Sequence, residues 1–260
     1  MEHFSLKKSN SRKQASQTGH ALYVVVVSLM LGILLVVFSF RAAIYSAMIA
    51  SNEADYQRAF EAAQAMLEDA IEDIQLNFMP TPQLRGASAT GFPASAEAFE
   101  DWAHAMERMP NLPCGHGICL KRIQGENFWD EESALAHMLT VGARYGTYSG
   151  KTSLPHHDPI LSAREAHKGA WYWIEPMLMQ MPGTAALADD HETPAPPTIT
   201  LAFKLTAVAL GMKGAGAGPS LVDRSRTMAV IQRVVTLGPA LATATGQQRP
   251  LHTLSWRQMQ

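Results

Sequence analysis

The clearest pattern in the chain is a run of apolar residues close to its start. No charged residue interrupts Ala21 to Phe40, and the next charge is Arg41. A helix of this length is about 30 Å long, which matches the hydrocarbon core of a bilayer. An ordinary secretory signal has a shorter apolar core of about 7–15 residues, and the residues after this run continue to look helical. The pattern predicts a membrane-spanning helix over 20–40, and an uncleaved anchor is one interpretation of it.

The residues after the span predict that the same helix continues, as an amphipathic helix, over 41–79. Neither Gly nor Pro occurs between Ile44 and Phe78, and apolar residues recur every three or four positions. These are Phe60, Ala63, Leu67, Ile71, Ile74 and Phe78. They lie on one helix face, and the acidic residues are expected largely on the other: Glu61, Glu68, Asp69, Glu72 and Asp73. Pro80 and Pro82 end the helix, because proline lacks the backbone donor.

The residues after the helix, 80–237, are enough for one globular head domain. Its first part is expected to hold two helices. Ser95 is the predicted N-cap of a helix that runs through Met109. A second helix is predicted from Glu131 to Val141, and we interpret Glu131 and Glu132 as charges at its N-terminus rather than as a catalytic pair.

The second part of the head changes to the period of a strand. In Ile199–Ala207, apolar residues at every second position alternate with Thr200, Ala202, Lys204 and Thr206, which is typical of a half-buried strand. Trp171–Glu175 and Met228–Leu237 are predicted strands beside it, although Gln232 and Arg233 break the alternation of the second. Helices first and strands later favour an α+β fold, in which the long helix lies across an antiparallel sheet.

Several segments carry no regular pattern. Pro182–Pro197 is rich in Pro, Ala and Asp and is predicted to be a loop. Residues 238–260 are expected to be a poorly ordered C-terminal tail. Gly214–Gly218 lacks the Gly-Lys-Ser/Thr ending of a phosphate-binding loop, so we interpret it as a hairpin connection. His156, His157 and Asp158 lie between two prolines and are interpreted as a solvated turn, with a metal site as the alternative.

Charge predicts the orientation of the span. Residues 1–19 carry four cations, and such residues normally stay in the cytoplasm. Everything after Arg41 is then expected outside the cytoplasm. The formal net charge of −2 gives no indication of nucleic-acid binding. The serine-hydrolase, zinc-protease and kinase motifs are missing from the sequence, so we expect no enzyme and no cofactor.

The chain contains two cysteines, Cys114 and Cys119, five positions apart in the segment predicted to lie outside the cytoplasm. In an oxidising compartment a disulfide is the default expectation. Gly115 and Gly117 permit the tight turn that such a bond needs. The alternative is a zinc site that adds His116, but no second pair of cysteines supplies a reliable fourth ligand.

The basic leader, Gly19, the apolar run and its amphipathic continuation together resemble the N-terminus of type IV pilins and pseudopilins. Residues 52–65, NEADYQRAFEAAQA, are similar to the same region of PilX-type minor pilins, which carry an Asn, an Arg- and Gln-containing turn and Ala-Phe-x-Ala-Ala-x-Ala. Residues 114–119, CGHGIC, resemble the short Cys–Gly–Cys loop of that family. Residues 171–175 and 203–207 look like two of its strands. The resemblance runs in order over most of the chain.

This resemblance implies that a prepilin peptidase cleaves the chain between Gly19 and His20 and that the new amino group of His20 is methylated. His20 departs from the Phe or Met that is usual there. Val24 stands where major pilins have a glutamate, which in lipid pairs with the terminal amine of the subunit ahead. A subunit with Val24 lacks that anionic partner, which suits a first or near-tip position in the filament.

The function that the resemblance implies is that of a minor pilin, a structural subunit that helps to initiate or cap a type IV pilus. It would first lie in the bacterial inner membrane with its head in the periplasm, and later in the pilus at the cell surface. The implied partners are membrane lipid, other minor and major pilins, the inner-membrane assembly platform and a PilY-type tip adhesin. Two alternatives stay open: a large tip pseudopilin of type II secretion, and an uncleaved single-pass periplasmic binding or sensory protein.

Overall fold

The computed structural model describes residues 18–78, 85, 91–108, 114–120, 127–152, 158–181, 197–212, 227–238, 241–243, 246–248 and 250–259. The chain divides into two compact units, residues 1–51 and 52–260. Helix α1, Thr18–Asn77, begins in the first unit and ends in the second. The described part of the head contains four shorter helices: α2 (Phe99–Glu107), η1 (Phe128–Asp130), α3 (Glu132–Val141) and α4 (Pro159–Ser162).

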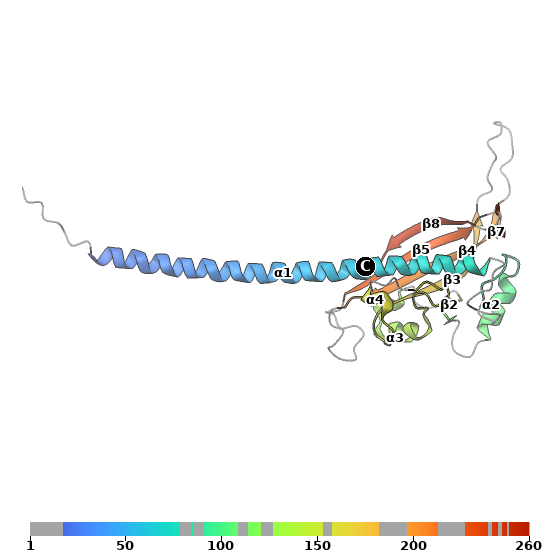
Figure 1. Cartoon of the computed structure of the whole chain (residues 1–260), viewed down its shortest axis with the longest axis horizontal. Coiled ribbons are helices and arrows are strands. Elements are labelled where there is room, and N and C mark those ends of the chain that lie inside the picture. The colour runs from blue at the N-terminus through green and yellow to red at the C-terminus, as the bar shows by residue number, and fades with distance from the viewer. Residues whose placement is uncertain are drawn as a thin grey trace, which may run out of the picture. The chain divides into compact units, whose positions relative to one another are not determined.

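A six-stranded sheet in the order β1-β2-β3-β4-β5-β8 forms the centre of the head (Figure 1). Its strands are β1 (Cys114–Gly115), β2 (Ile118–Cys119), β3 (Ala170–Met181), β4 (Thr198–Leu210), β5 (Met228–Leu237) and β8 (Leu251–Gln258). Neighbouring strands are antiparallel except β2 and β3, which are parallel. Strands β6 (Leu241–Thr243) and β7 (Gly246–Gln248) pair with each other in a separate sheet.

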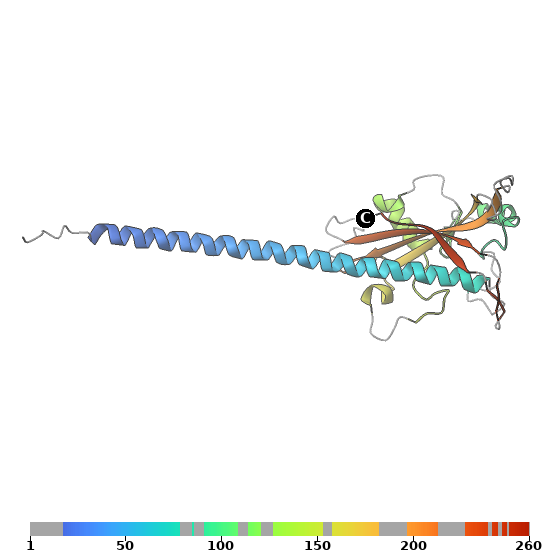
Figure 2. The same ribbon diagram turned by 90° about the horizontal axis from the view of Figure 1, so that it is seen from above.

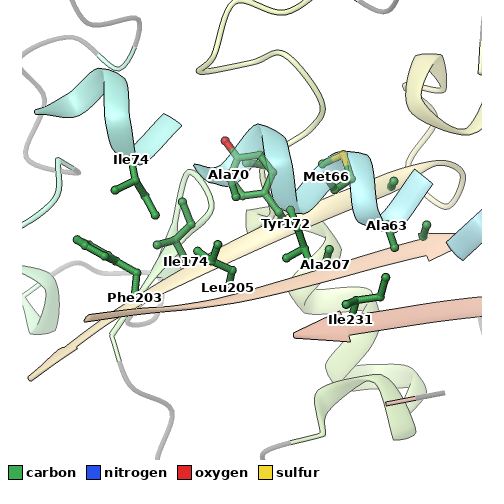
Figure 3. Packing of buried hydrophobic residues seen from close by; sticks show 14 of the residues in the cluster. Ala63, Met66, Ala70, Ile74, Tyr172, Ile174, Phe203, Leu205, Ala207 and Ile231 are labelled. Carbon is green, nitrogen blue, oxygen red and sulfur yellow. The ribbon is translucent and has the colours of Figure 1, made fainter. Parts of the chain in front are cut away.

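The sheet separates two hydrophobic clusters, each covered by a helix. The last part of α1 packs on one face, and α3 with η1 packs on the other (Figures 1 and 2). Figure 3 shows the first face, where Ala63, Met66 and Ala70 of the helix meet the side chains of Tyr172 and Leu205 from the sheet. Side chains along a strand alternate between faces, so one strand supplies both clusters.

Strand β3 has an almost continuously apolar sequence because both of its faces are buried. Tyr172 and Ile174 point towards α1, whereas Trp171 and Trp173 lie in the cluster under α3. The indole N–H of Trp173 donates to the carbonyl oxygen of Met138 in α3 at 3.1 Å. A strand that is buried on both faces carries no polar alternation. Strand β3 is also longer than the predicted Trp171–Glu175, and residues 177–181 at its end are partly exposed.

The structure confirms the α+β layout and most of the predicted elements. The long helix reaches Asn77, α3 begins one residue later than predicted, and β5 has the predicted bounds. The two residues that break the alternation of β5 have partners of their own. Gln232 is buried and bonds to Thr206 on β4, whereas Arg233 bonds to Glu68 on α1.

Two of the acidic residues expected on the outer side of the helix are buried, so this expectation was wrong. Asp69 and Asp73 have relative exposures of 0% and 2%. Their spacing explains the outcome, because they continue the row of Ala59, Ala62 and Met66 at helical intervals of three or four. The face buried against the sheet is therefore wider than its apolar residues alone indicate.

The first head helix also differs from its prediction. It begins at Phe99 rather than just after Ser95, and Ala98 is its N-cap. The hydroxyl of Ser95 accepts a hydrogen bond from the backbone N–H of Ala98 at 3.3 Å. Ser95 therefore closes a turn that precedes the helix, and the predicted end at Met109 lies outside the described residues.

The expectation of a poorly ordered tail after Gly238 was wrong as well. Residues 251–258 form β8, which pairs with β5 along the edge of the sheet. Most of its side chains are exposed, so the strand carries little hydrophobic signal. Backbone bonds hold both of its ends: Gly238 donates to Pro250 at 2.7 Å and Met259 donates to Val230 at 2.9 Å. An edge strand of this kind depends on its ladder rather than on burial.

Candidate functional site: the long helix and its docking contacts

Residues 20–40 of α1 present apolar side chains around the whole helix. Leu22, Leu35 and Phe38 have relative exposures of 69%, 68% and 67%. Covering one such side chain gains about 1.5–3 kcal/mol, so an aqueous environment strongly disfavours the uncovered surface. Among the described residues, α1 is long and apolar enough to cross a membrane, and its position near the N-terminus fits a membrane span or a signal anchor.

The residues that were linked to processing lie in this apolar part of the chain. Gly19 and His20 belong to α1, and Val24 follows His20 by four residues, which places both on the same side of the helix. The side chain of Val24 has a relative exposure of 59%. Residues 20–40 contain no acidic residue, so Val24 has no carboxylate near it on its own helix.

A shallow groove runs along the side of the helix that carries Val24. Ser28 and Gly32 form its floor one turn apart, because their side chains are the smallest on this side. A methyl group added at Gly32 would meet no atom within 4 Å. The remaining lining residues are Val24, Val25, Leu29, Ile33, Val36 and Val37. Small residues spaced in this way allow the backbone of another apolar helix to approach closely.

Within the head, three buried aspartates fix the continuation of α1 to other elements; we call them the docking aspartates, Asp55, Asp69 and Asp73. Asp73 forms a buried ion pair with Arg85, whose Nε donates to Oδ1 at 2.7 Å and whose Nη2 donates to Oδ2. The hydroxyl of Tyr172 donates to the same Oδ2 at 2.9 Å. Asp73 is thereby bonded both to the sheet and to the segment that follows the helix.

The other two docking aspartates accept bonds from loops. Asp69 accepts from the backbone N–H of Gly146 at 2.8 Å and from the hydroxyl of Ser149. Asp55 accepts from the backbone N–H of Met212 at 3.0 Å and from the hydroxyl of Thr227. Buried carboxylates need such donors, because a buried charge without partners is costly. On the more exposed side of the helix, Glu72 pairs with Lys151 at 2.5 Å.

Burial and charge together set the protonation of these groups. Burial raises the pKa of Asp69, and the hydrogen bonds from Ser149 and Gly146 do not cancel that effect. Burial would lower the pKa of Arg85, but the bond to Asp73 and its charge outweigh burial and raise it. Burial, followed by the charge of Asp73, raises the pKa of Tyr172 well above its ordinary value. Arg85 therefore stays charged and Tyr172 keeps the proton that it donates.

The two cysteines form a disulfide that joins β1 and β2 at the open end of their hairpin, opposite the turn. His116 and Gly117, the two turn residues, have φ angles of 54° and 78°, the pattern of a type I′ turn. Because each sulfur is bonded to the other, the alternative zinc site has no thiolate ligand. Nδ1 of His116 lies 3.0 Å from the hydroxyl of Tyr148.

The remaining candidate residues have local roles or lie outside the described residues. Asp158 caps α4, since its Oδ1 accepts from the backbone N–H of Ile160 at 2.8 Å. Glu131 is the N-cap residue of α3 and accepts a bond from Ser133 at 2.6 Å. His156, His157, Gly214–Gly218, residues 1–17 and residues 182–196 are not among the described residues.

Sequence reasoning predicted the long apolar helix and the disulfide but missed the docking aspartates and Arg85. One available signal was the helical spacing that places Asp69 and Asp73 in line with Ala62 and Met66. Arg85 offers no comparable pattern, because it reaches Asp73 twelve residues away from a segment after the helix.

Replacing Asp73 by Asn should lower the free energy of unfolding of the head by about 3–5 kcal/mol. The change leaves Arg85 as a buried cation without its counter-charge, and breaking a buried ion pair from one side has this cost. Urea denaturation of the full chain in detergent micelles, followed by tryptophan fluorescence, measures the effect. Glu61→Gln, on the exposed side of the same helix, is the matched control and should stay within about 0.5 kcal/mol of the wild type. Equal stability of the two variants would contradict a role for the ion pair.

The raised pKa of Asp69 should make the head less stable as the pH rises. The folded state then holds this proton more tightly than the unfolded chain, whose carboxyl titrates near 3.8. Stability from this group is thus present below that pH and is lost as the pH rises through the folded-state pKa. Asp69→Asn has no such proton, so the stability difference between wild type and variant should decline over that window and then stay constant. Urea denaturation at a series of pH values tests this, and a difference that increases with pH would disprove it.

A comparison with protein families, with curated proteins and with solved structures finds no match to this chain.

Proposed function

We propose that this chain is a minor pilin, a structural subunit that helps to initiate or cap a type IV pilus near its tip. The observation that supports this most strongly is the nature of α1, one helix of 60 residues. Its first part carries exposed apolar side chains, and its last part is built into the core of a sheet-based head. An anchor needs only the first property. A filament subunit needs both, because the helix that packs against its neighbours must also carry the head.

The apolar part of the helix has two successive environments in this proposal. Lipid covers it before assembly, and the helices of other minor and major pilins cover it in the filament. Both environments remove the same side chains from water, so transfer between them changes little hydrophobic free energy. The groove at Ser28 and Gly32 offers one side on which a neighbouring helix can pack closely.

Val24 supports a position at or near the tip. A carboxylate at this place would be costly in lipid unless the terminal amine of the preceding subunit paired with it. With Val24 no charge needs to be neutralised, so the subunit can enter the filament without an earlier subunit ahead of it. The proposal includes a prepilin peptidase that cleaves before His20, the inner-membrane assembly platform and a PilY-type adhesin as partners.

A large tip pseudopilin of type II secretion remains the related candidate, because it too lacks the glutamate. The exposed apolar segment and Val24 favour both equally. Deletion of the gene separates them: loss of pili supports the pilus subunit, whereas loss of secreted proteins with normal piliation supports the pseudopilin.

Deleting this protein should lower the number of pili per cell, with partial recovery when retraction is blocked, because an initiating subunit affects assembly rather than one chemical reaction. Leu31→Glu should reproduce the deletion, since an unpaired ion in the middle of the span costs at least about 2.5–3.5 kcal/mol on insertion scales. Val24→Glu is the matched control and should be tolerated better, because a terminal amine can pair with it. Counting pili by electron microscopy in the complemented strains gives the result. Normal piliation in the Leu31→Glu strain would show that the helix is only an anchor.

The mature chain should begin at His20 and carry a methylated amino group. Mass spectrometry of the N-terminal peptide from a piliated cell measures both features. Gly19→Leu should leave the full-length precursor, because a large residue at the cleavage position blocks the peptidase, whereas Ser28→Ala should be processed normally. A native chain that still begins at Met1 would favour the uncleaved periplasmic binding or sensory protein instead.

A further inference from the structure

Arg85 joins the long helix to the disulfide hairpin. Its guanidinium forms the buried ion pair with Asp73, and its third donor group, Nη1, donates to the carbonyl oxygen of His116 at 2.9 Å. The aromatic rings of Tyr148 and Phe92 lie 3.8 Å and 5.1 Å from its carbon Cζ. The side chain of Arg85 has a relative exposure of 3%. Within the described residues, its guanidinium donates hydrogen bonds to Asp73 and to His116.

The position of the His116 carbonyl depends on the turn that the disulfide closes. The strands on either side of this turn, β1 and β2, have only two residues each, which is too short to hold a hairpin by its ladder. His116 also adopts a left-handed conformation that residues other than Gly disfavour. The bond between Cys114 and Cys119 holds the two strands together directly below this strained residue.

The other half of the turn has independent support, so loss of the disulfide should act locally. The N–H of Gly117 donates to Val141 at 2.7 Å, and its carbonyl accepts from Ile174 at 2.7 Å. These bonds keep Gly117 on the core whether or not the sulfurs are joined. The residue that gains freedom is His116, and its carbonyl is the acceptor that Arg85 needs.

We infer that the Cys114–Cys119 disulfide and the docking of residues 69–77 of α1 are thermodynamically coupled through Arg85. When the carbonyl of His116 moves, a buried cation loses an acceptor, and the ion pair that holds the end of the helix weakens. Coupling is reciprocal, so a docked helix must stabilise the disulfide by the same factor by which the disulfide stabilises docking. This coupling involves residues of the head alone, so it does not depend on assembly of the chain into a pilus.

Burial of the sulfurs indicates the order in which disulfide formation and helix docking occur. Cys114 and Cys119 have relative exposures of 7% and 0% in the folded head, which closes them to attack by a thiol. In the oxidation step, the two thiols transfer two electrons and two protons to a disulfide oxidant, which leaves as a dithiol. That exchange is faster before the turn is buried, so oxidation should precede the full docking of the end of α1.

Hydrogen–deuterium exchange of the full chain in detergent micelles tests the first half of the coupling. In a Cys114→Ala, Cys119→Ala variant, the amides of residues 69–77 should exchange faster than in the wild type by a factor of about 5 to 150, the usual range of such couplings. The amides of β4 and β5 should keep their protection. Unchanged exchange at residues 69–77 would overturn the inference. Equal loss of protection across the whole sheet would also overturn it, because the disulfide would then stabilise the whole head rather than the docking of the helix end.

The redox equilibrium of the disulfide tests the second half without removing a cysteine. The full chain is equilibrated with mixtures of reduced and oxidised dithiothreitol, and the fraction of free thiols is measured by alkylation and mass spectrometry. Asp73→Asn should shift the midpoint towards easier reduction, by at most the factor found in the exchange experiment. Glu72→Gln, which removes the ion pair with Lys151 one residue away, is the matched control and should leave the midpoint unchanged. Identical midpoints for Asp73→Asn and the wild type would overturn the inference.

Discussion

The contact between α1 and the sheet is the interaction on which the head depends. On the helix side it consists mainly of small residues, and the large side chains come from the strands. The helix contributes Ala59, Ala62, Ala63, Met66, Leu67, Ala70 and Ile74, all fully buried. Alanine side chains let the helix backbone approach the sheet, so that Tyr172 and Phe203 fill the space between them (Figure 3). This explains why a segment rich in alanine, which has little hydrophobic area of its own, still forms a core.

A surface of alanines is smooth and does not by itself select one position of the helix. The docking aspartates supply that selection. A shift of the helix by one turn, about 5.4 Å, would move three carboxylates away from their donors and leave them buried without partners. Asp55, Asp69 and Asp73 each bond to a different part of the head, so the helix is held at several places along its length. Hydrophobic burial provides the driving force for docking, and the buried carboxylates determine the register.

The same helix has a second surface that the described residues leave uncovered. Its first part consists of apolar side chains that are more than half exposed at most positions. Such a surface requires an apolar environment, and a bilayer and a bundle of similar helices both provide one. The proposed function rests on this requirement together with the docked head. In that proposal, one helix serves lipid, neighbouring subunits and its own head domain in turn.

The sequence alone was sufficient for the features that depend on local periodicity. An uninterrupted apolar run predicted the exposed apolar part of α1, and spacings of three and four predicted its docked part. Alternation predicted β4 as a strand, but the expectation that it is half-buried was wrong, because most of it is buried on both faces. The disulfide was expected from the predicted placement of both cysteines outside the cytoplasm, with a zinc site as the alternative, and the structure shows the bond. None of these inferences requires knowledge of a distant part of the chain.

Tertiary structure decided the features that depend on contacts between distant residues. Asp73 looks like a solvated acid until Arg85 and Tyr172, the latter 99 residues away, are placed beside it. The sequence of β8 carries no strand pattern, and its structure depends on pairing with the edge of β5. In both cases the stabilising groups are hydrogen-bond partners rather than apolar side chains. The sequence thus determined which surfaces avoid water, whereas only the folded chain determined which polar groups can be buried, because a polar group is buried at acceptable cost only where the fold brings it a partner.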